Sequence, residues 1–94
     1  MPFFAFIGYD GPRGGELRPE HRPAHIEGLK GLAAADRIRH AGPLIGEEGT
    51  PIGSLIVFEA DDLEAARAIA EGDPYVTRGI FDRWELHETR VVFP

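Results

Sequence analysis

FFAFIGY, residues 3–9, is an apolar and aromatic run that ends at the sequence Asp10-Gly11-Pro12. Such a run followed by turn-forming residues predicts a β-strand. Successive side chains of a strand point to opposite faces of a sheet, and here both sets are apolar. We therefore expect this strand to be covered on both of its faces.

Outward from this strand, the chain alternates between helical and strand patterns. Apolar residues recur at helical spacing over residues 22–40 and again over residues 61–72, where Asp61 has the position of a helix cap. Residues 10–18 hold three glycines and one proline, so we expect a mobile loop there. Further strands are predicted at residues 41–46, 52–60 and 80–89.

The predicted order β-α-β-β-α-β is that of a ferredoxin-like α+β fold, with an antiparallel sheet and two helices on one face. Residues 1–94 form one domain, and Pro43 within the strand at 41–46 indicates either an edge strand or the start of a strand. The face away from the helices also carries apolar residues, which a monomer would expose. We therefore predict a homodimer of the dimeric α/β-barrel kind, because a twofold interface is the commonest solution.

Charge and composition narrow the function classes. The formal net charge of −6 disfavours nucleic acid and acidic membrane surfaces as partners, because both are negatively charged. The absence of cysteine excludes disulfides, thiolate catalysis and cysteine metal sites. No apolar run is long enough to span a membrane, and the first residues lack the pattern of a signal peptide. A cytoplasmic location is the default expectation.

His25 is the first candidate for chemistry. If Pro23 is the first residue of the helix, His25 lies in the first turn, where the helix dipole disfavours the imidazolium form. A neutral imidazole can act as a general base. The positive charge of Arg22 also disfavours the imidazolium form of His25, and Arg22 could bind an anionic group of a substrate. The structural alternative is a histidine that only caps or packs the start of the helix.

Asp73 is the second candidate, and it has a structural alternative as well. It precedes Pro74 as the cap of a short helical turn, yet the same carboxylate could accept a hydrogen bond from a histidine ring. Tyr75 could line the same cleft, and Ser54 could contact a ligand. Asp36 shares a helical stripe with His25 but lies too far along the axis to touch it, so we expect it to be exposed.

A metal site is not predicted. His21 and His25 have the spacing of a helical metal pair, but Pro23 lies between them and spacing places no third ligand. We expect no cofactor.

Five short motifs, in order along the chain, resemble the YciI-like (YCII-related) family of the dimeric α/β-barrel superfamily. They are Arg22-Pro23-Ala24-His25, Ala41-Gly42-Pro43, Gly53-Ser54, Asp73-Pro74-Tyr75-Val76 and Gly79. The resemblance implies a ferredoxin-like dimer and a cleft with a His–Asp pair, which falls here on His25 and Asp73. Family members with an assigned activity include a dehydrochlorinase that acts on a chlorinated hydroxyhydroquinone. This chain departs from the family in its longer loop at Gly11–Gly15 and its short turn at Glu47–Pro51.

Together these patterns predict a small-molecule enzyme of the lyase or isomerase type. His25 and Asp73 would form its acid–base pair, and Arg22, Ser54 and Tyr75 would bind a small cyclic or carbonyl-containing substrate. Two alternatives stay open: a binding protein that uses the same cleft without catalysis, and a dimerisation domain.

Overall fold

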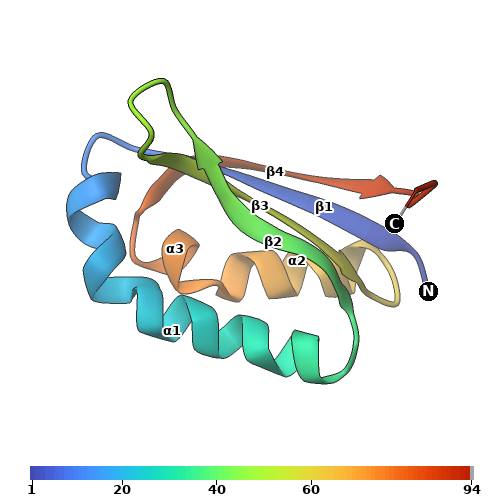
Figure 1. Ribbon diagram of the computed structural model, residues 1–94. Helices are drawn as coiled ribbons and strands as arrows, with labels where there is room; N and C mark the ends of the chain where they lie inside the picture. The colour runs from blue at the N-terminus through green and yellow to red at the C-terminus, as the bar shows by residue number, and fades with distance from the viewer. Residues whose placement is uncertain (94) are drawn as a thin grey trace.

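The computed structural model describes residues 1–93, and Figure 1 shows the course of the chain. Strand β1 (Phe3–Asp10) forms at the apolar run that opens the sequence. The short helix α3 lies at the turn predicted after Asp73, and the βαββαβ order is confirmed. The remaining elements are α1 (Gly14–Ala34), β2 (Ile38–Ile45), β3 (Pro51–Glu59), α2 (Leu63–Gly72), α3 (Pro74–Thr77) and β4 (Phe81–Thr89).

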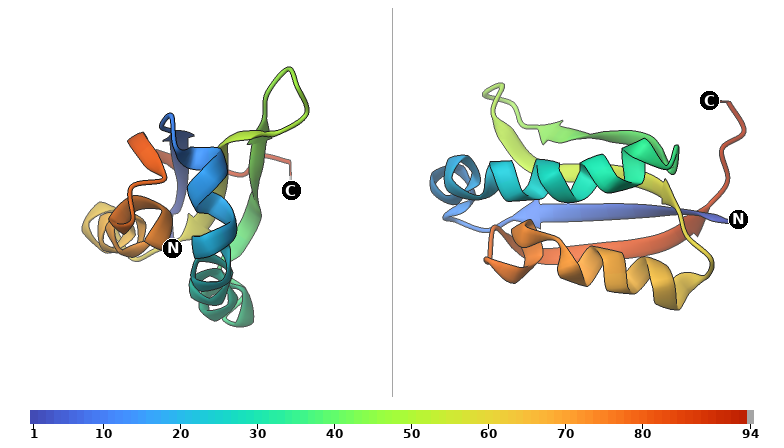
Figure 2. Two further views of the ribbon diagram at one scale, coloured as in Figure 1. Left: turned by 90° about the vertical axis from the view of Figure 1, so that its left-hand side faces the viewer. Right: turned by 90° about the horizontal axis from the view of Figure 1, so that it is seen from below.

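The four strands form one antiparallel sheet in the order β2-β3-β1-β4. Helices α1 and α2 lie on the same face of this sheet, as the two views of Figure 2 show. The ferredoxin-like fold class is therefore confirmed. Strand β2 is an edge strand, as Pro43 predicted, because a proline there removes no ladder hydrogen bond from a central strand.

The core lies between the sheet and the helices. Phe4 of β1 pairs in register with Phe58 of β3, and both side chains are almost completely buried. Burial of each such side chain stabilises the fold by about 2–3 kcal/mol. Gly8 continues this face of β1, and the ring of Phe81 occupies the space that a Cβ at Gly8 would need. Gly8 thus leaves room for the ring of Phe81, which packs against Tyr75 in the site described below.

Helix α1 begins eight residues earlier than the sequence predicted. The pattern placed a loop at residues 10–18, but Gly14–Arg18 are helical and both Pro19 and Pro23 lie inside the helix. Each internal proline removes a backbone hydrogen bond, at a cost of about 3 kcal/mol. Tertiary contacts of this first stretch offset that cost: Leu17 packs against the core and Arg18 pairs with Asp10.

Two other predicted boundaries are also wrong. Helix α1 ends at Ala34, and Asp36 turns the chain with a left-handed φ of 56° before β2 starts. The cap of α2 is Asp62, one residue after the predicted Asp61, and its side chain accepts a hydrogen bond from the Ala65 amide. Leu63, the first residue of α2, is 46% exposed, while Ala66 and Ala70 are buried.

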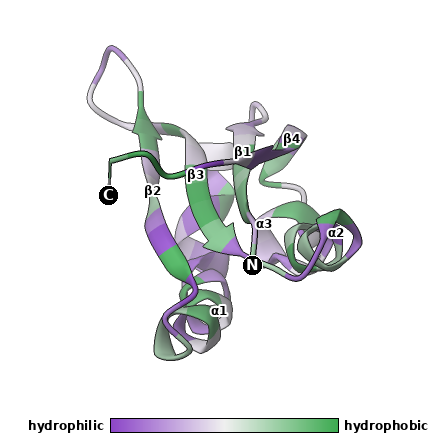
Figure 3. Cartoon of the chain, turned by 90° about the vertical axis from the view of Figure 1, so that its right-hand side faces the viewer, coloured by the Kyte–Doolittle hydropathy of each residue, from purple (hydrophilic) through white to green (hydrophobic). Residues whose placement is uncertain are grey.

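The face of the sheet away from the helices carries a set of partly exposed apolar side chains. Figure 3 looks along the strands and shows the C-terminal segment running over this side. Val91 to Phe93 line a hollow there together with Val57 of β3 and His40 of β2. We call this surface the open face; its apolar strand residues are Phe3, Ala5, Ile7, Leu44, Leu55 and Val57.

No helix within residues 1–93 has both the length and the apolar character that crossing a membrane requires.

Candidate active site

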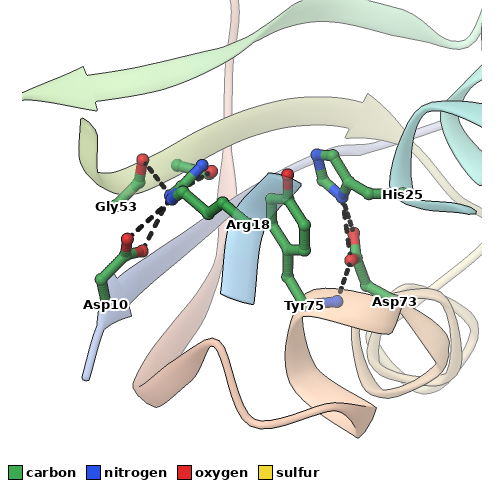
Figure 4. Close-up of polar contacts among 7 residues, drawn as sticks. Asp10, Arg18, His25, Gly53, Asp73 and Tyr75 are labelled. Carbon is green, nitrogen blue, oxygen red and sulfur yellow. Dashed lines mark hydrogen bonds and ion pairs between the residues drawn. The ribbon is translucent and has the colours of Figure 1, made fainter. Parts of the chain in front are cut away.

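His25 and Asp73 meet between α1 and α3, although 48 positions separate them in the chain. Nδ1 of His25 lies 2.9 Å from Oδ1 and 3.0 Å from Oδ2 of Asp73. Both side chains are about nine-tenths buried. Oδ1 of Asp73 also accepts a hydrogen bond of 2.8 Å from the Tyr75 amide, so the carboxylate caps α3 and contacts the imidazole at once (Figure 4).

Tyr75 fixes the plane of the histidine ring. The two rings are stacked, with centroids 3.9 Å apart and an angle of 5° between their planes. The tyrosine ring itself packs edge-on against Phe81 and is 2% exposed. Burial raises the pKa of Tyr75, and the opposing effect of the nearby Arg18 and Arg22 charges is smaller. The phenol is therefore neutral at physiological pH and can donate a hydrogen bond.

A cleft of about 270 Å³ opens beside these rings. Nε2 of His25 has no hydrogen-bond partner among residues 1–93, while every fully buried side-chain nitrogen or oxygen in that part of the chain has one. Nε2 is therefore accessible, and His25 is one of the residues that line the cleft. The full lining is Arg18, Arg22, His25, Ile26, Leu29, Ala41, Gly42, Pro43, Pro51, Ser54, Ile56 and Tyr75.

Arg18 is a residue of this cleft that the sequence analysis missed. Its guanidinium binds Asp10 through two hydrogen bonds, Nε to Oδ2 at 2.7 Å and Nη2 to Oδ1 at 2.8 Å. Nη2 also donates to the Gly53 carbonyl at 2.8 Å and to Oγ of Ser54 at 3.3 Å. Burial lowers the pKa of Arg18, but the contacts with Asp10, together with the smaller effect of Tyr75, outweigh burial and raise it. The guanidinium is therefore permanently charged and tied to two strands.

One signal in the sequence could have indicated Arg18. Gly14 and Arg18 are spaced four residues apart, as neighbours on one helix face are, and Asp10 at the end of β1 comes shortly before them. A Cβ at Gly14 would lie 2.5 Å from Oδ2 of Asp10, so the glycine leaves room for the carboxylate. The assignment of residues 10–18 to a loop concealed this relation.

The structure brings the five site residues predicted from the sequence to one place. Asp73 binds Nδ1 of His25, while Arg22, Ser54 and Tyr75 line the same cleft as the histidine. The physical argument for His25 was wrong in one respect. It lies about three helical turns from the start of α1, so the dipole at that end does not act on it.

Two other residues weighed in the sequence lie elsewhere. The Asp36 side chain is 97% exposed, as expected, and contacts Arg39 rather than the cleft. Nε2 of His21 lies 3.8 Å from Oε2 of Glu20, and His21 is not among the residues that line the cleft. No group of three or more His, Asp or Glu side chains in residues 1–93 is arranged to hold a metal ion.

The model of the YCII-related domain matches residues 2–90, almost the whole chain. The chain belongs to the YCII-related domain family. Protein YciI of Escherichia coli is 33% identical over 84 residues, which cover 83% of this chain and 86% of that protein. An uncharacterized protein of Haemophilus influenzae is 32% identical over 85 residues, which cover 84% of this chain and 87% of that protein.

A solved structure of similar fold is that of 5-chloro-2-hydroxyhydroquinone dehydrochlorinase (TftG) from Burkholderia phenoliruptrix, in complex with 2,5-dihydroxybenzoquinone. It superposes with a TM-score of 0.84 over 94% of this chain and 93% of that chain, at 24% identity. This likeness confirms the ferredoxin-like fold of the YCII-related chain.

Proposed function

We propose that the cleft is the active site of an enzyme that transfers a proton to or from a small cyclic or carbonyl-containing molecule. The single observation that carries this proposal is the His25–Asp73 contact, with Nδ1 held by a buried carboxylate and Nε2 accessible at the cleft. A histidine in this arrangement has the geometry of a general acid–base group.

Asp73 selects the tautomer of the histidine. A carboxylate accepts hydrogen bonds, so Nδ1 carries the proton and Nε2 keeps its lone pair. Nε2 takes a proton from the substrate, and the electron pair left behind moves onto a substrate oxygen or expels a leaving group. The imidazolium formed is stabilised by Asp73 and returns the proton in a later step. Such a step is that of a lyase or an isomerase and needs no cofactor.

The size and lining of the cleft support a single-ring substrate. Its volume of about 270 Å³ lies near the lower end of small-molecule sites. Ile26, Leu29 and Ile56 provide apolar walls for a ring, while Arg22, Ser54 and Tyr75 provide polar groups for its oxygen atoms. The similar fold of TftG, a dehydrochlorinase solved with a dihydroxybenzoquinone, favours ring compounds of this kind as the first substrates to test.

The test is a screen of single-ring hydroxyquinones, phenols and lactones with the wild type and matched variants. We expect His25→Ala and Asp73→Asn to lower kcat/KM by about 10²–10⁴, the usual contribution of general acid–base catalysis. His21→Ala, one helical turn before His25 and outside the cleft lining, is the control and keeps kcat/KM within about twofold. Turnover retained in His25→Ala, or saturable binding without turnover in the wild type, contradicts the proposal.

We further propose that a second copy of the chain covers the open face. Ile7 and Leu55 lie opposite each other in register at its centre, and Val92 and Phe93 beside it are 77% and 91% exposed. Apolar side chains gathered on an exposed sheet face commonly mark a protein–protein interface. A twofold dimer buries the same surface of both copies and so covers the face completely.

Sedimentation tests the dimer. The wild type is expected at twice the chain mass of 10.3 kDa at micromolar concentration, and Leu55→Glu at one chain mass. Leu63→Glu, on the exposed side of α2, is the control and stays with the wild type. A wild type that sediments as a single chain contradicts the dimer.

A further inference from the structure

We infer that the β2–β3 hairpin of one copy of the chain docks into the C-terminal hollow of a second copy. The docking element is residues 45–52, which we call the arm. The C-terminal hollow is the one on the open face that Val91 to Phe93 line together with Val57 and His40. This inference rests on the proposed dimer and adds which parts of the two copies meet, so the dimer can hold even where the arm lies elsewhere.

The arm extends beyond the rest of the sheet. Strand β1 pairs with β3 only as far as Gly53, so no third strand flanks the arm. Figure 1 shows that it bends away from the helices at the end of the sheet far from the C-terminus. Its turn is closed by two backbone hydrogen bonds, from the Gly46 amide to the Thr50 carbonyl at 2.9 Å and from the Gly49 amide to the Gly46 carbonyl at 3.0 Å. A projecting element that is already ordered loses little conformational entropy when it docks.

The arm and the hollow both expose apolar side chains. Ile45 and Ile52 of the arm are 56% and 52% exposed, and Val92 and Phe93 beside the hollow are exposed still further. The hollow has a volume of about 310 Å³, which lies within the range of sites that hold a small ligand and so admits an isoleucine side chain. Contact between the two regions removes the exposed apolar surface of both from water.

The charges of the two regions are opposite. Glu47 and Glu48 at the tip of the arm are exposed and form no salt bridge within residues 1–93. The lining of the hollow contains Arg39 and Arg90 and no acidic residue; Arg39 is already paired with Glu59 at 2.8 Å, so Arg90 is the cation that the tip would meet. Two copies with a net charge of −6 repel each other, and opposite charges at the contact therefore favour one relative orientation.

A twofold axis can bring each arm to the hollow of the other copy. Both regions involve β2 and β3, but the hollow lies near the start of β1 at Phe3 and the arm begins beyond Tyr9. The strand between these two residues is about 20 Å long, so the arm cannot reach the hollow of its own copy. An axis that lies between two facing sheets and crosses the strands near Leu55 exchanges the two ends of the sheet. Both contacts then form at once, as twofold symmetry requires.

The experiment introduces cysteine pairs into a chain that has no cysteine of its own. The double variant Glu48→Cys, Val92→Cys is incubated with oxidised glutathione at micromolar protein concentration and followed by non-reducing electrophoresis. A disulfide requires Cα atoms within about 7 Å, so this pair can close only between copies. We expect covalent dimers, without a ladder of longer chains, to form at least tenfold faster than in the control Glu48→Cys, Leu63→Cys. Leu63 is exposed like Val92, but it lies on the helix side of the sheet.

Charge reversal provides a second measurement in the wild-type backbone. We expect Arg90→Glu, and likewise the double variant Glu47→Lys, Glu48→Lys, to raise the dissociation constant of the dimer at least fivefold in sedimentation. Their combination restores it to within about twofold, because the opposite charges meet again. Arg13→Glu, at an exposed position of α1, leaves it unchanged.

The outcomes separate this inference from the proposed dimer. A wild type that sediments as a single chain refutes both. A dimeric wild type in which the Glu48–Val92 cysteine pair forms covalent dimers no faster than the control overturns the docking of the arm and leaves the dimer standing. A ladder of linked chains, or a charge reversal that its counterpart does not restore, overturns it as well.

Discussion

Replacement of Arg18 by glutamine is expected to destabilise the protein strongly, because the residue links three elements. Its guanidinium joins the end of β1, through Asp10, to β3, through Gly53 and Ser54, from a position in the first turns of α1. The variant leaves the Asp10 carboxylate 8% exposed and without its cation. Among residues 1–93, no other cationic side chain lies within salt-bridge distance of that carboxylate.

The magnitude follows from the burial of the pair. Removal of one partner of a buried ion pair costs about 3–5 kcal/mol. Both side chains here retain about a tenth of their exposure, so we place the loss for Arg18→Gln at the lower end, about 3 kcal/mol. Asp10→Asn keeps one acceptor for the guanidinium and is expected to lose about 1–2 kcal/mol. The double variant should be more stable than the sum of these losses predicts, by about 2 kcal/mol.

Urea unfolding measures the free energy of unfolding of the wild type, the two single variants and the double variant. Trp84 is the only tryptophan and packs against Phe6, so its fluorescence reports the loss of the core. With a slope near 1.5 kcal/mol per molar urea, a loss of about 3 kcal/mol moves the midpoint by about 2 M. Arg13→Gln breaks an exposed pair on the same helix and should leave the midpoint unchanged. Losses below about 1 kcal/mol for Arg18→Gln, or additive effects in the double variant, refute the reasoning.

Three other expectations concern single positions. Gly14→Ala places a Cβ 2.5 Å from Asp10 and should cost about 1–3 kcal/mol, whereas Gly15→Ala, with nothing within 4 Å, should gain up to about 1 kcal/mol; equal urea midpoints would contradict this. The pKa of Tyr75 is raised by burial and that of Tyr9 by its hydrogen bond to Glu85. Their stabilising effect is complete below about pH 10 and is lost as the pH rises through the folded pKa values, so tyrosinate absorbance of the native protein should appear at higher pH than in urea; coincident curves would be evidence against it. Phe58→Ala removes a fully buried ring and should cost about 3–5 kcal/mol in the same unfolding assay, and a loss below 1 kcal/mol would show that the ring is not part of the core.

The strands could be predicted from the sequence because their signal is local. Residues 3–9 and 52–60 are apolar on both faces, and each became a central strand of the sheet. Trp84 and Leu86 alternate with charged residues, and β4 became an edge strand with Trp84 and Leu86 packed against the core. In each case the side-chain period distinguishes a central strand from an edge strand.

The start of α1 could not be predicted in this way, because its cause is not local. Glycine and proline between Gly11 and Pro23 weaken every local indication of a helix. What holds the first turns is a set of contacts with residues from other elements, among them Gly53 and Ser54, which are 35 and 36 positions from Arg18. A pattern within one segment carries no information on such contacts.

The catalytic candidates likewise combine a local signal with a non-local one. His25 and Asp73 could be named from the sequence because each stands in a short motif, but their distance depends on how α1 and α3 pack. The turn that begins at Asp73 fixes one of the two partners by local interactions. Asp73 caps α3 through the Tyr75 amide, and this bond orients the carboxylate whether or not a histidine is present. Tyr75, the next residue but one, then supplies the ring on which His25 stacks. One four-residue helix and its cap thus set both the acceptor and the plane of the imidazole, and helix α1 has only to deliver the side chain. In the proposed proton transfer, these groups would need little reorganisation, because the turn and the stacked ring already fix their positions.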